Sequence, residues 1–295
     1  MKYILSPIIL CVALSICHQS NGALFSWGGG GQPTTAEPSP CGIGMVPINE
    51  EQNGTMEASA GQIVWEMSVM TKNMGATWGH TCGGALITKQ AVLTSASCVD
   101  GLNAGFVRVH GATVDLPKGG FVRRRRMSYP GQQITGMSYT EKIVTHPEYN
   151  KITGENNLAV LRLATALDFT KAEGKLNAIC YPEQPLAAGD PGQLFVSGWG
   201  KIHVASQVRA KLQLKPIEKI DCPFFSNVNE FCATQEGQCE GDMGGPVFTS
   251  NELNLYSQLI GITSRGKTCS PDDPMIYTEV QPYLAWIKDA AKPYY

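Results

Sequence analysis

Short apolar runs separated by turn residues make up most of the chain from about residue 61 onward. The runs are rich in aliphatic residues, and Gly, Pro, Asn and Asp lie between them. Such a pattern is typical of β-strands joined by turns. The clearest runs lie at residues 63–70, 84–95, 106–116, 193–200 and 255–264.

A helical period is found only at the carboxyl end of the chain. Val280, Tyr283, Ile287 and Ala290 are spaced so that they can share one helix face, with Trp286 beside them. Many short strands followed by one terminal helix predict an all-β protein, built as a sandwich or a barrel.

The first 22 residues have the pattern of a secretory signal peptide. Lys2 provides a positive start, residues 4–17 form an apolar run, and residues 20–22 resemble a cleavage site before Ala23. A membrane anchor is the alternative, but the run is too short to span a bilayer comfortably. We therefore expect a secreted, extracellular protein without a membrane partner.

Residues 23–56 form a leader ahead of one domain at residues 57–295. Residues 23–40 contain four consecutive glycines, three prolines and few apolar residues, which is typical of a flexible or extended segment. Asn53 opens an Asn-Gly-Thr sequon. We expect glycosylation at Asn53 unless the sequon is a chance match.

Cysteine pairing is expected to be complete in the mature chain. The sequence has ten cysteines, and Cys11 and Cys17 leave with the signal peptide. An even number in a secreted chain predicts disulfides. A zinc site is the weaker alternative because no Cys-x-x-Cys pair occurs, so we expect no metal and no cofactor. The residues alone cannot choose among about a hundred pairings. The remaining cysteines are Cys41, Cys82, Cys98, Cys180, Cys222, Cys232, Cys239 and Cys269.

Charge excludes one class of partner and suggests another. The net charge of −2 gives no global attraction to nucleic acid. Four consecutive arginines cannot all be buried, so they belong on an exposed loop or edge. They form a merely solvated loop, an exosite for an anionic polysaccharide or acidic partner, or a proprotein-convertase cleavage site before Met127. The four residues are Arg123, Arg124, Arg125 and Arg126.

Five motifs occur in an order that resembles the chymotrypsin/trypsin family of serine proteases. They are Cys-Gly-Gly-Ala-Leu-Ile at 82–87, Val-Leu-Thr-Ser-Ala-Ser-Cys at 92–98, His-Pro-Glu-Tyr-Asn at 146–150, Ser-Gly-Trp-Gly at 197–200 and Gly-Asp-Met-Gly-Gly-Pro at 241–246. Each motif is weak alone, but the ordered set is specific. The resemblance implies two six-stranded antiparallel β-barrels with a site in the cleft between them, followed by a carboxyl-terminal helix.

The positions of the catalytic triad carry other residues. The family's histidine, aspartate and serine positions match Ser97, Asn157 and Met243. A serine hydroxyl is not a base near neutral pH, an amide carries no charge to offset an imidazolium, and a thioether has no proton to release. The resemblance therefore implies a protein without peptidase activity.

The substrate pocket is also degenerate by this resemblance. Met275 replaces a wall glycine and should fill the slot, and Arg265 replaces the tryptophan that follows the serine of the substrate-binding strand. The oxyanion-hole amides would belong to Gly241 and Met243. The pocket positions are Gly237, Ser264, Arg265, Gly266 and Met275.

These substitutions favour a binding protein over an enzyme. We expect a non-catalytic serine protease homologue whose partner is an extracellular protein, either a protease or a protease substrate. Similar arthropod proteins act in protease cascades of innate immunity or in seminal fluid. Residues 23–40 contain no cysteine, so no clip domain is expected there. The alternative is a peptidase with an unorthodox centre that uses a recruited histidine.

Four disulfides follow from the resemblance and not from spacing. It implies the pairs Cys82–Cys98, Cys222–Cys232 and Cys239–Cys269. The remaining pair, Cys41–Cys180, would tether the leader to the domain.

Asp242 requires a partner of its own. In active members of the resembled family, a freed amino terminus inserts beside this aspartate. The equivalent stretch here, residues 52–55, follows two glutamates, so no trypsin-like cut is expected. Zymogens of the family instead place a histidine and a serine near the aspartate. By this resemblance we predict an Asp242–His80 contact supported by Ser68.

Overall fold

The computed structural model describes most of the chain beyond residue 40. These residues belong to one compact unit, Ser39–Tyr295. The signal peptide, residues 23–40, Asn53 and the arginines at 123–126 lie outside the described residues, as do Gly237, Cys239, Gly241 and Cys269. The described segments are 41–48, 54–72, 77–116, 121–122, 135–182, 193–200, 211–222, 227–234, 242–251, 256–266 and 274–295.

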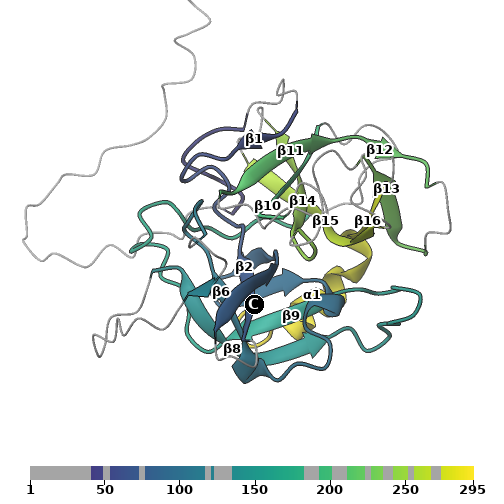
Figure 1. Cartoon of the computed structure of the whole chain (residues 1–295), viewed down its shortest axis with the longest axis horizontal. Coiled ribbons are helices and arrows are strands. Elements are labelled where there is room, and N and C mark those ends of the chain that lie inside the picture. Colours follow the sequence, from purple (N-terminus) through teal and green to yellow (C-terminus); the bar gives the residue numbers. More distant parts are fainter. Residues whose placement is uncertain are drawn as a thin grey trace, which may run out of the picture. The chain divides into compact units, whose positions relative to one another are not determined.

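Two curled antiparallel β-sheets form the fold, and Figure 1 shows them as two separate bodies of strands. The predicted class, a trypsin-like pair of β-barrels with a terminal helix, is confirmed by this arrangement. Each sheet has eight strands instead of six. Three of the sixteen strands in the described residues have only two residues each.

The first sheet has the strand order β4-β5-β9-β8-β6-β2-β3-β7. An isolated bridge between Glu66, just before β2, and Ala85 in β4 brings one edge back and curls the sheet. Short 3₁₀ turns lie at Ala96–Cys98 and Ala104–Phe106. Its strands are β2 (Ser68–Lys72), β3 (Trp78–Cys82), β4 (Ala85–Thr88), β5 (Ala91–Thr94), β6 (Val107–His110), β7 (Phe121–Val122), β8 (Met137–Thr145) and β9 (Ala159–Leu163).

The second sheet has the strand order β1-β11-β10-β14-β15-β16-β13-β12. The pair formed by β14 and β15 contains a register shift between Val247 and Phe248, where the strand bends. Its strands are β1 (Met56–Glu57), β10 (Leu194–Gly198), β11 (Gln213–Ile217), β12 (Lys219–Ile220), β13 (Glu230–Ala233), β14 (Pro246–Asn251), β15 (Tyr256–Gly266) and β16 (Met275–Glu279).

Three of the predicted apolar runs differ in detail from the observed strands. The run at 63–70 enters β2 only at Ser68, the run at 84–95 is a hairpin of β4 and β5, and the run at 106–116 is a strand only in β6. Gly83 and Gly84 separate β3 from β4. A Cβ on Gly84 would lie 2.7 Å from the Val92 Cγ1 atom, so the neighbouring strand can pack closely only against glycine.

A large hydrophobic core contains residues from both sheets. Trp65, before β2, packs edge-on against Phe248 of β14, with ring centroids 5.2 Å apart. A smaller core lies within the second sheet and includes Tyr277. The partly buried side chain of Met243 packs against both cores.

The terminal helix matches its predicted face. A 3₁₀ turn at Gln281–Tyr283 leads into α1 (Leu284–Ala290). Val280, Tyr283, Ile287 and Ala290 are all buried. The Arg162 Nε atom of β9 donates to the Ala290 carbonyl at 2.7 Å, which holds the helix end against the first sheet. Among the described residues, no helix is long and apolar enough to cross a membrane.

Three disulfides are present in the described residues, with the pairs that the resemblance implies. They are Cys41–Cys180, Cys82–Cys98 and Cys222–Cys232. The Cys41–Cys180 disulfide attaches the end of the leader to the domain. Cys180 itself forms an isolated β-bridge with Gln258 of β15. The expected Cys239–Cys269 pair lies outside the described residues.

The disulfide that closes the longest loop should stabilise the fold most. Cys41 and Cys180 are 139 residues apart, whereas Cys222 and Cys232 are 10 apart. From loop-closure entropy, we expect replacement by serine to lower the free energy of unfolding by about 5 kcal/mol for the first pair and about 3 kcal/mol for the second. Urea unfolding of the two double variants measures the difference. An equal or larger loss from the shorter loop would contradict this prediction.

Candidate functional site

The residues at the predicted triad positions come from both sides of the fold. Ser97 lies in the 3₁₀ turn after β5, and Asn157 lies just before β9. Met243 lies in the turn before β14. Ser264 of β15 joins them from the second sheet. The site is therefore assembled at the junction of the two sheets.

Asn157 is the centre of a closed set of neutral hydrogen bonds. Its Oδ1 atom accepts from the Ser97 amide at 2.8 Å. Its Nδ2 atom donates to the Ser97 Oγ at 3.2 Å, to the Ser264 Oγ at 3.0 Å and to the Ser264 carbonyl at 3.3 Å. Asn157 is buried, so a side chain that both donates and accepts satisfies groups that a carboxylate could only partly satisfy.

Met243 has a packing role in this arrangement. Its side chain contacts both cores, and its carbonyl accepts from the Gly83 amide at 2.8 Å. The next residue, Gly244, has φ of +77°, and a Cβ there would lie 2.1 Å from the Thr94 Oγ1 atom. Only glycine fits at this position. The turn is thus held tightly against the first sheet.

Asp242 forms a fully buried ion pair with Lys215 of β11. The Lys215 Nζ atom lies 2.9 Å from the Asp242 Oδ2 atom, and the side chains are 1% and 0% exposed. The Gly200 amide donates to Oδ1 at 2.8 Å. Buried charges are tolerated when they are both paired and hydrogen-bonded, and this carboxylate has both kinds of contact.

Glycine makes room for the Asp242 carboxylate. A Cβ on Gly198 would lie 2.1 Å from its Oδ1 atom, and a Cβ on Gly200 would lie 2.3 Å from its Oδ2 atom. These two glycines flank Trp199 in the Ser-Gly-Trp-Gly motif. The motif therefore forms one wall of the aspartate site.

The structure places the three residues of the predicted Asp242–His80–Ser68 contact as follows. The supporting half is present, because the Ser68 Oγ and His80 Nδ1 atoms lie 2.8 Å apart. His80 also packs edge-on against Trp199, with centroids 5.6 Å apart. The Asp242 carboxylate binds the Lys215 ammonium and the Gly200 amide, and the expected contact with His80 stays a prediction.

A second buried acid lies close to this pair. The Ser197 Oγ atom is 2.5 Å from the Glu66 Oε2 atom. Burial raises the pKa of Glu66 well above its ordinary value, the Ser197 hydrogen bond lowers it, and the negative charge of Asp242 raises it further. The Lys215 ammonium binds Asp242 and lowers the pKa of Glu66 only slightly, so the protonated form of Glu66 is favoured.

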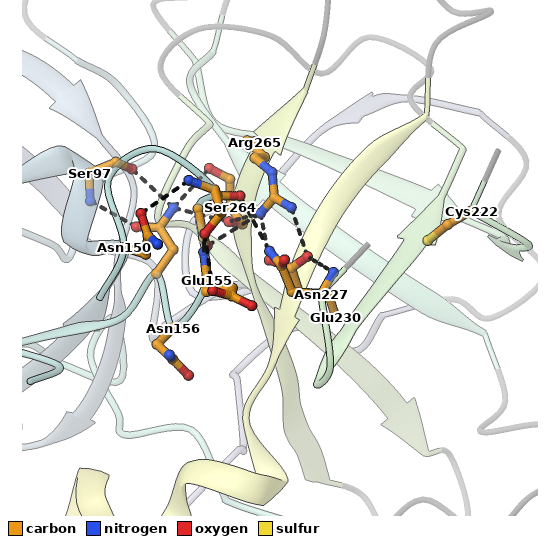
Figure 2. A network of polar contacts seen from close by, with 12 residues as sticks. Ser97, Asn150, Glu155, Asn156, Cys222, Asn227, Glu230, Ser264 and Arg265 are labelled. Carbon is orange, nitrogen blue, oxygen red and sulfur yellow. Dashed lines mark hydrogen bonds and ion pairs between the residues drawn. The ribbon is translucent and has the colours of Figure 1, made fainter. Parts of the chain in front are cut away.

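Arg265 forms a clamp next to the hydrogen bonds of Ser264, as Figure 2 shows. Its NH1 and NH2 atoms bind the two carboxylate oxygens of Glu230 at 2.5 and 2.8 Å. The Glu230 side chain is only 1% exposed. NH1 also lies 3.4 Å from the Gly154 carbonyl. The guanidinium thus joins a loop of the first sheet to the start of β13 in the second.

Two of the predicted pocket positions lie side by side in the second sheet. Met275 is fully buried in the second core, and Gly266, its register partner in β15, is half-buried. Gly237 and Gly241 lie outside the described residues. No cluster that could hold a metal ion is found in the described segments.

Several residues of the site carry no signal in the sequence. Lys215 lies 27 residues before Asp242, and Glu230 lies 35 residues before Arg265. A lysine within an apolar strand is the one available hint, because lysine is rarely buried without a partner. Glu66 is similarly a charged residue between two buried apolar neighbours, Trp65 and Met67.

Two curled antiparallel sheets with a site at their junction define the architecture of the trypsin-like proteins. The chain matches the family described as trypsin over residues 52–287. It is 27% identical over 284 residues to CLIP domain-containing serine protease B9 of Anopheles gambiae, with 89% of this chain and 68% of that protein covered. It is also 27% identical over 269 residues to chymotrypsin-C of Mus musculus, covering 85% and 93%. The chain belongs to the trypsin family.

Replacing Lys215 by methionine should destabilise the protein strongly. The variant leaves Asp242 buried without its cation, which typically costs about 3–5 kcal/mol. The double variant Lys215→Met/Asp242→Asn removes both charges and should recover much of that loss. Guanidinium unfolding of the wild type, the single variant and the double variant tests this. A single variant as stable as the wild type would show that the ion pair does not hold the turn.

Glu66 should make stability depend on pH. Because its folded pKa is raised, the folded state keeps a proton that the unfolded chain releases above the ordinary pKa of about 4.3. Stability is therefore lost as pH rises from there toward the folded pKa. Glu66→Gln removes this loss, so its melting temperature should exceed that of the wild type more at about pH 8 than at about pH 5.

The exposed Glu57 of β1 offers a matched control for this comparison. Glu57→Gln removes the same charge from the surface and should show no such trend. A gap between Glu66→Gln and the wild type that stays constant over the pH range would contradict the assignment.

Proposed function

We propose that this chain is a non-catalytic, secreted serine protease homologue that acts as a binding and regulatory protein. The observation that carries the proposal is the Ser97–Asn157–Ser264 hydrogen-bond set, with Met243 packed beside it. Acyl transfer needs a nucleophile, a base and a group that stabilises the charged base. Met243 has no proton to release at the nucleophile position, the Ser97 hydroxyl is not a base at the histidine position, and the Asn157 amide carries no charge at the aspartate position.

The substrate side of the site supports the same proposal. The Arg265 guanidinium is tied to Glu230 and lies against Gly154. Met275 is buried in the core. Side chains that are already paired or packed would have to leave their partners before a peptide could bind there. Both catalysis and substrate recognition are therefore disfavoured.

A peptidase with an unorthodox centre receives less support. Among the described residues, the only hydrogen-bonded serine–histidine pair is Ser68 with His80, and Ser68 is fully buried. His146 packs against the rings of Tyr283 and Trp286. A nucleophile must reach substrate, so neither histidine offers a usable base for one.

The regulatory setting is proposed to be an extracellular protease cascade, in reproduction or innate immunity. Similarity to a serine protease of a mosquito supports a protease-rich setting, because homologues that lose catalysis keep the surface that binds related proteins. The partner would be a protease or a protease substrate. An anionic polysaccharide bound by the arginines at 123–126 is a separate expectation that rests on the sequence alone.

The purified protein should hydrolyse no substrate. We expect no turnover of a fluorogenic peptide panel or of ester substrates, and no labelling by a covalent serine-hydrolase probe. Loss of the triad typically lowers turnover about a million-fold. The variant Ser97→His/Asn157→Asp/Met243→Ser should also show little activity, because Arg265 and Met275 still occupy the substrate side.

Two controls make this result interpretable. An active trypsin at the same concentration checks the assay, and the melting temperature of the restored variant checks its folding. Robust hydrolysis by the wild type would overturn the proposed function, provided that the activity stays with the protein through further purification.

A further inference from the structure

Two aliphatic side chains stand out on the surface of the described residues. Ile152 is 95% exposed and Val228 is 85% exposed, the highest values among the large hydrophobic side chains. Burying such side chains in a partner would be favourable. Single exposed aliphatic side chains are common, so the case for a contact surface depends on where these two lie relative to each other.

The two side chains lie at the tips of neighbouring loops. Ile152 belongs to the loop at 148–156, which connects β8 and β9 of the first sheet. Val228 belongs to the turn at 227–229, just before β13 of the second sheet. The Asn227 Nδ2 atom donates to the Thr153 carbonyl at 3.3 Å. Each aliphatic residue is adjacent in sequence to one member of this bond, so the two loops that carry them are neighbours.

The loop that carries Ile152 is fixed by its own hydrogen bonds. The Asn150 Oδ1 atom accepts from the amides of Ile152 and Thr153, at 2.9 and 3.3 Å. The Gly154 amide donates to the Asn150 carbonyl at 2.8 Å. At its base, the Tyr283 hydroxyl donates to the Asn156 Oδ1 atom at 2.7 Å. The tip is thus held in one shape before any partner arrives.

The Arg265 clamp holds the two loops together. Its guanidinium binds Glu230, which follows the Val228 turn, and lies against the Gly154 carbonyl next to the Ile152 tip. Figure 2 shows Arg265 reaching Glu230, with Asn227 beside that pair. Gly154 has φ of +78°, and a Cβ there would lie 2.8 Å from the guanidinium. A preorganised surface loses little conformational entropy on binding.

The rim of this surface is acidic in the described residues. Glu148 and Glu155 are exposed and form no ion pair among those residues. Lys151 is neutralised by Asp100 at 2.8 Å, and Arg265 is neutralised by Glu230. Two negative charges therefore remain beside the aliphatic tips, and they favour a partner with positive charge around its contact site.

We propose that Ile152 and Val228 form a two-pronged docking surface for a folded protein partner that offers an apolar pocket bordered by lysine or arginine side chains. The inference rests on the proposed function and names the part of the surface that binds. The convex tips enter the partner, so the partner supplies the concave site. The acidic rim sets the orientation and accelerates the encounter.

Site-specific photo-crosslinking tests this surface. A benzophenone amino acid replaces Ile152 or Val228 in the full chain, with Met45 as the control position, and each protein is irradiated in the secretion of the tissue that expresses it. We expect the same adduct from positions 152 and 228 and not from position 45. Its yield should fall as salt is raised from about 0.05 M to about 0.5 M.

Competition with unlabelled protein makes the test specific. Wild type and the control variant Met45→Asp/Met56→Asp should suppress the adduct equally. Ile152→Asp/Val228→Asp should compete at least about 10-fold less well. Both variants change exposed side chains. Their melting temperatures are measured to check that both proteins fold.

Each contrary outcome overturns the inference. The inference fails if no adduct forms, if the adduct is a second copy of this chain, or if both variants compete equally well. An acidic contact peptide in the partner also defeats it. The fluorogenic peptide panel, run on the same preparations, separates the two proposals. Hydrolysis by the wild type would overturn the proposed function, whereas failed docking without hydrolysis overturns only this inference.

Discussion

The buried ion pair between Lys215 and Asp242 is the interaction on which the site depends. It fixes the turn that contains Met243 against β11 of the second sheet. From there, the Met243 carbonyl reaches the Gly83 amide of the first sheet. Removing two charges from water is costly, and only good pairing with further hydrogen bonds offsets that cost. The turn is consequently held in the single position that satisfies both charges.

Lys215 belongs to the same domain as the carboxylate that it binds. The Asp242 carboxylate is neutralised by this lysine side chain. Gly198 and Gly200 leave the space that the carboxylate occupies. Glu66 then lies next to an aspartate that is already paired, and burial together with that negative charge favours its protonated form.

Around this pair, polar side chains at the junction of the two sheets bind one another. Asn157 satisfies Ser97 and Ser264 with neutral hydrogen bonds, and Arg265 uses its planar guanidinium to bind Glu230 through two contacts. The Asn157–Ser264 hydrogen bond joins the first sheet to the second. The contacts of Asn157 with Ser97 and of Arg265 with Glu230 hold the neighbouring side chains in place. The junction between the sheets is therefore held by polar contacts from both sheets.

The sequence by itself determined the fold class, the buried face of the terminal helix and the residue types at the predicted triad positions. These follow from local periodicity and from motifs whose members are close in the chain. Tertiary structure alone decided that Asp242 pairs with Lys215, that Arg265 pairs with Glu230, and that the loops carrying Ile152 and Val228 are neighbours. Such pairings depend on strand register and on how two sheets pack, and local periodicity carries no information about contacts between residues that are distant in the chain.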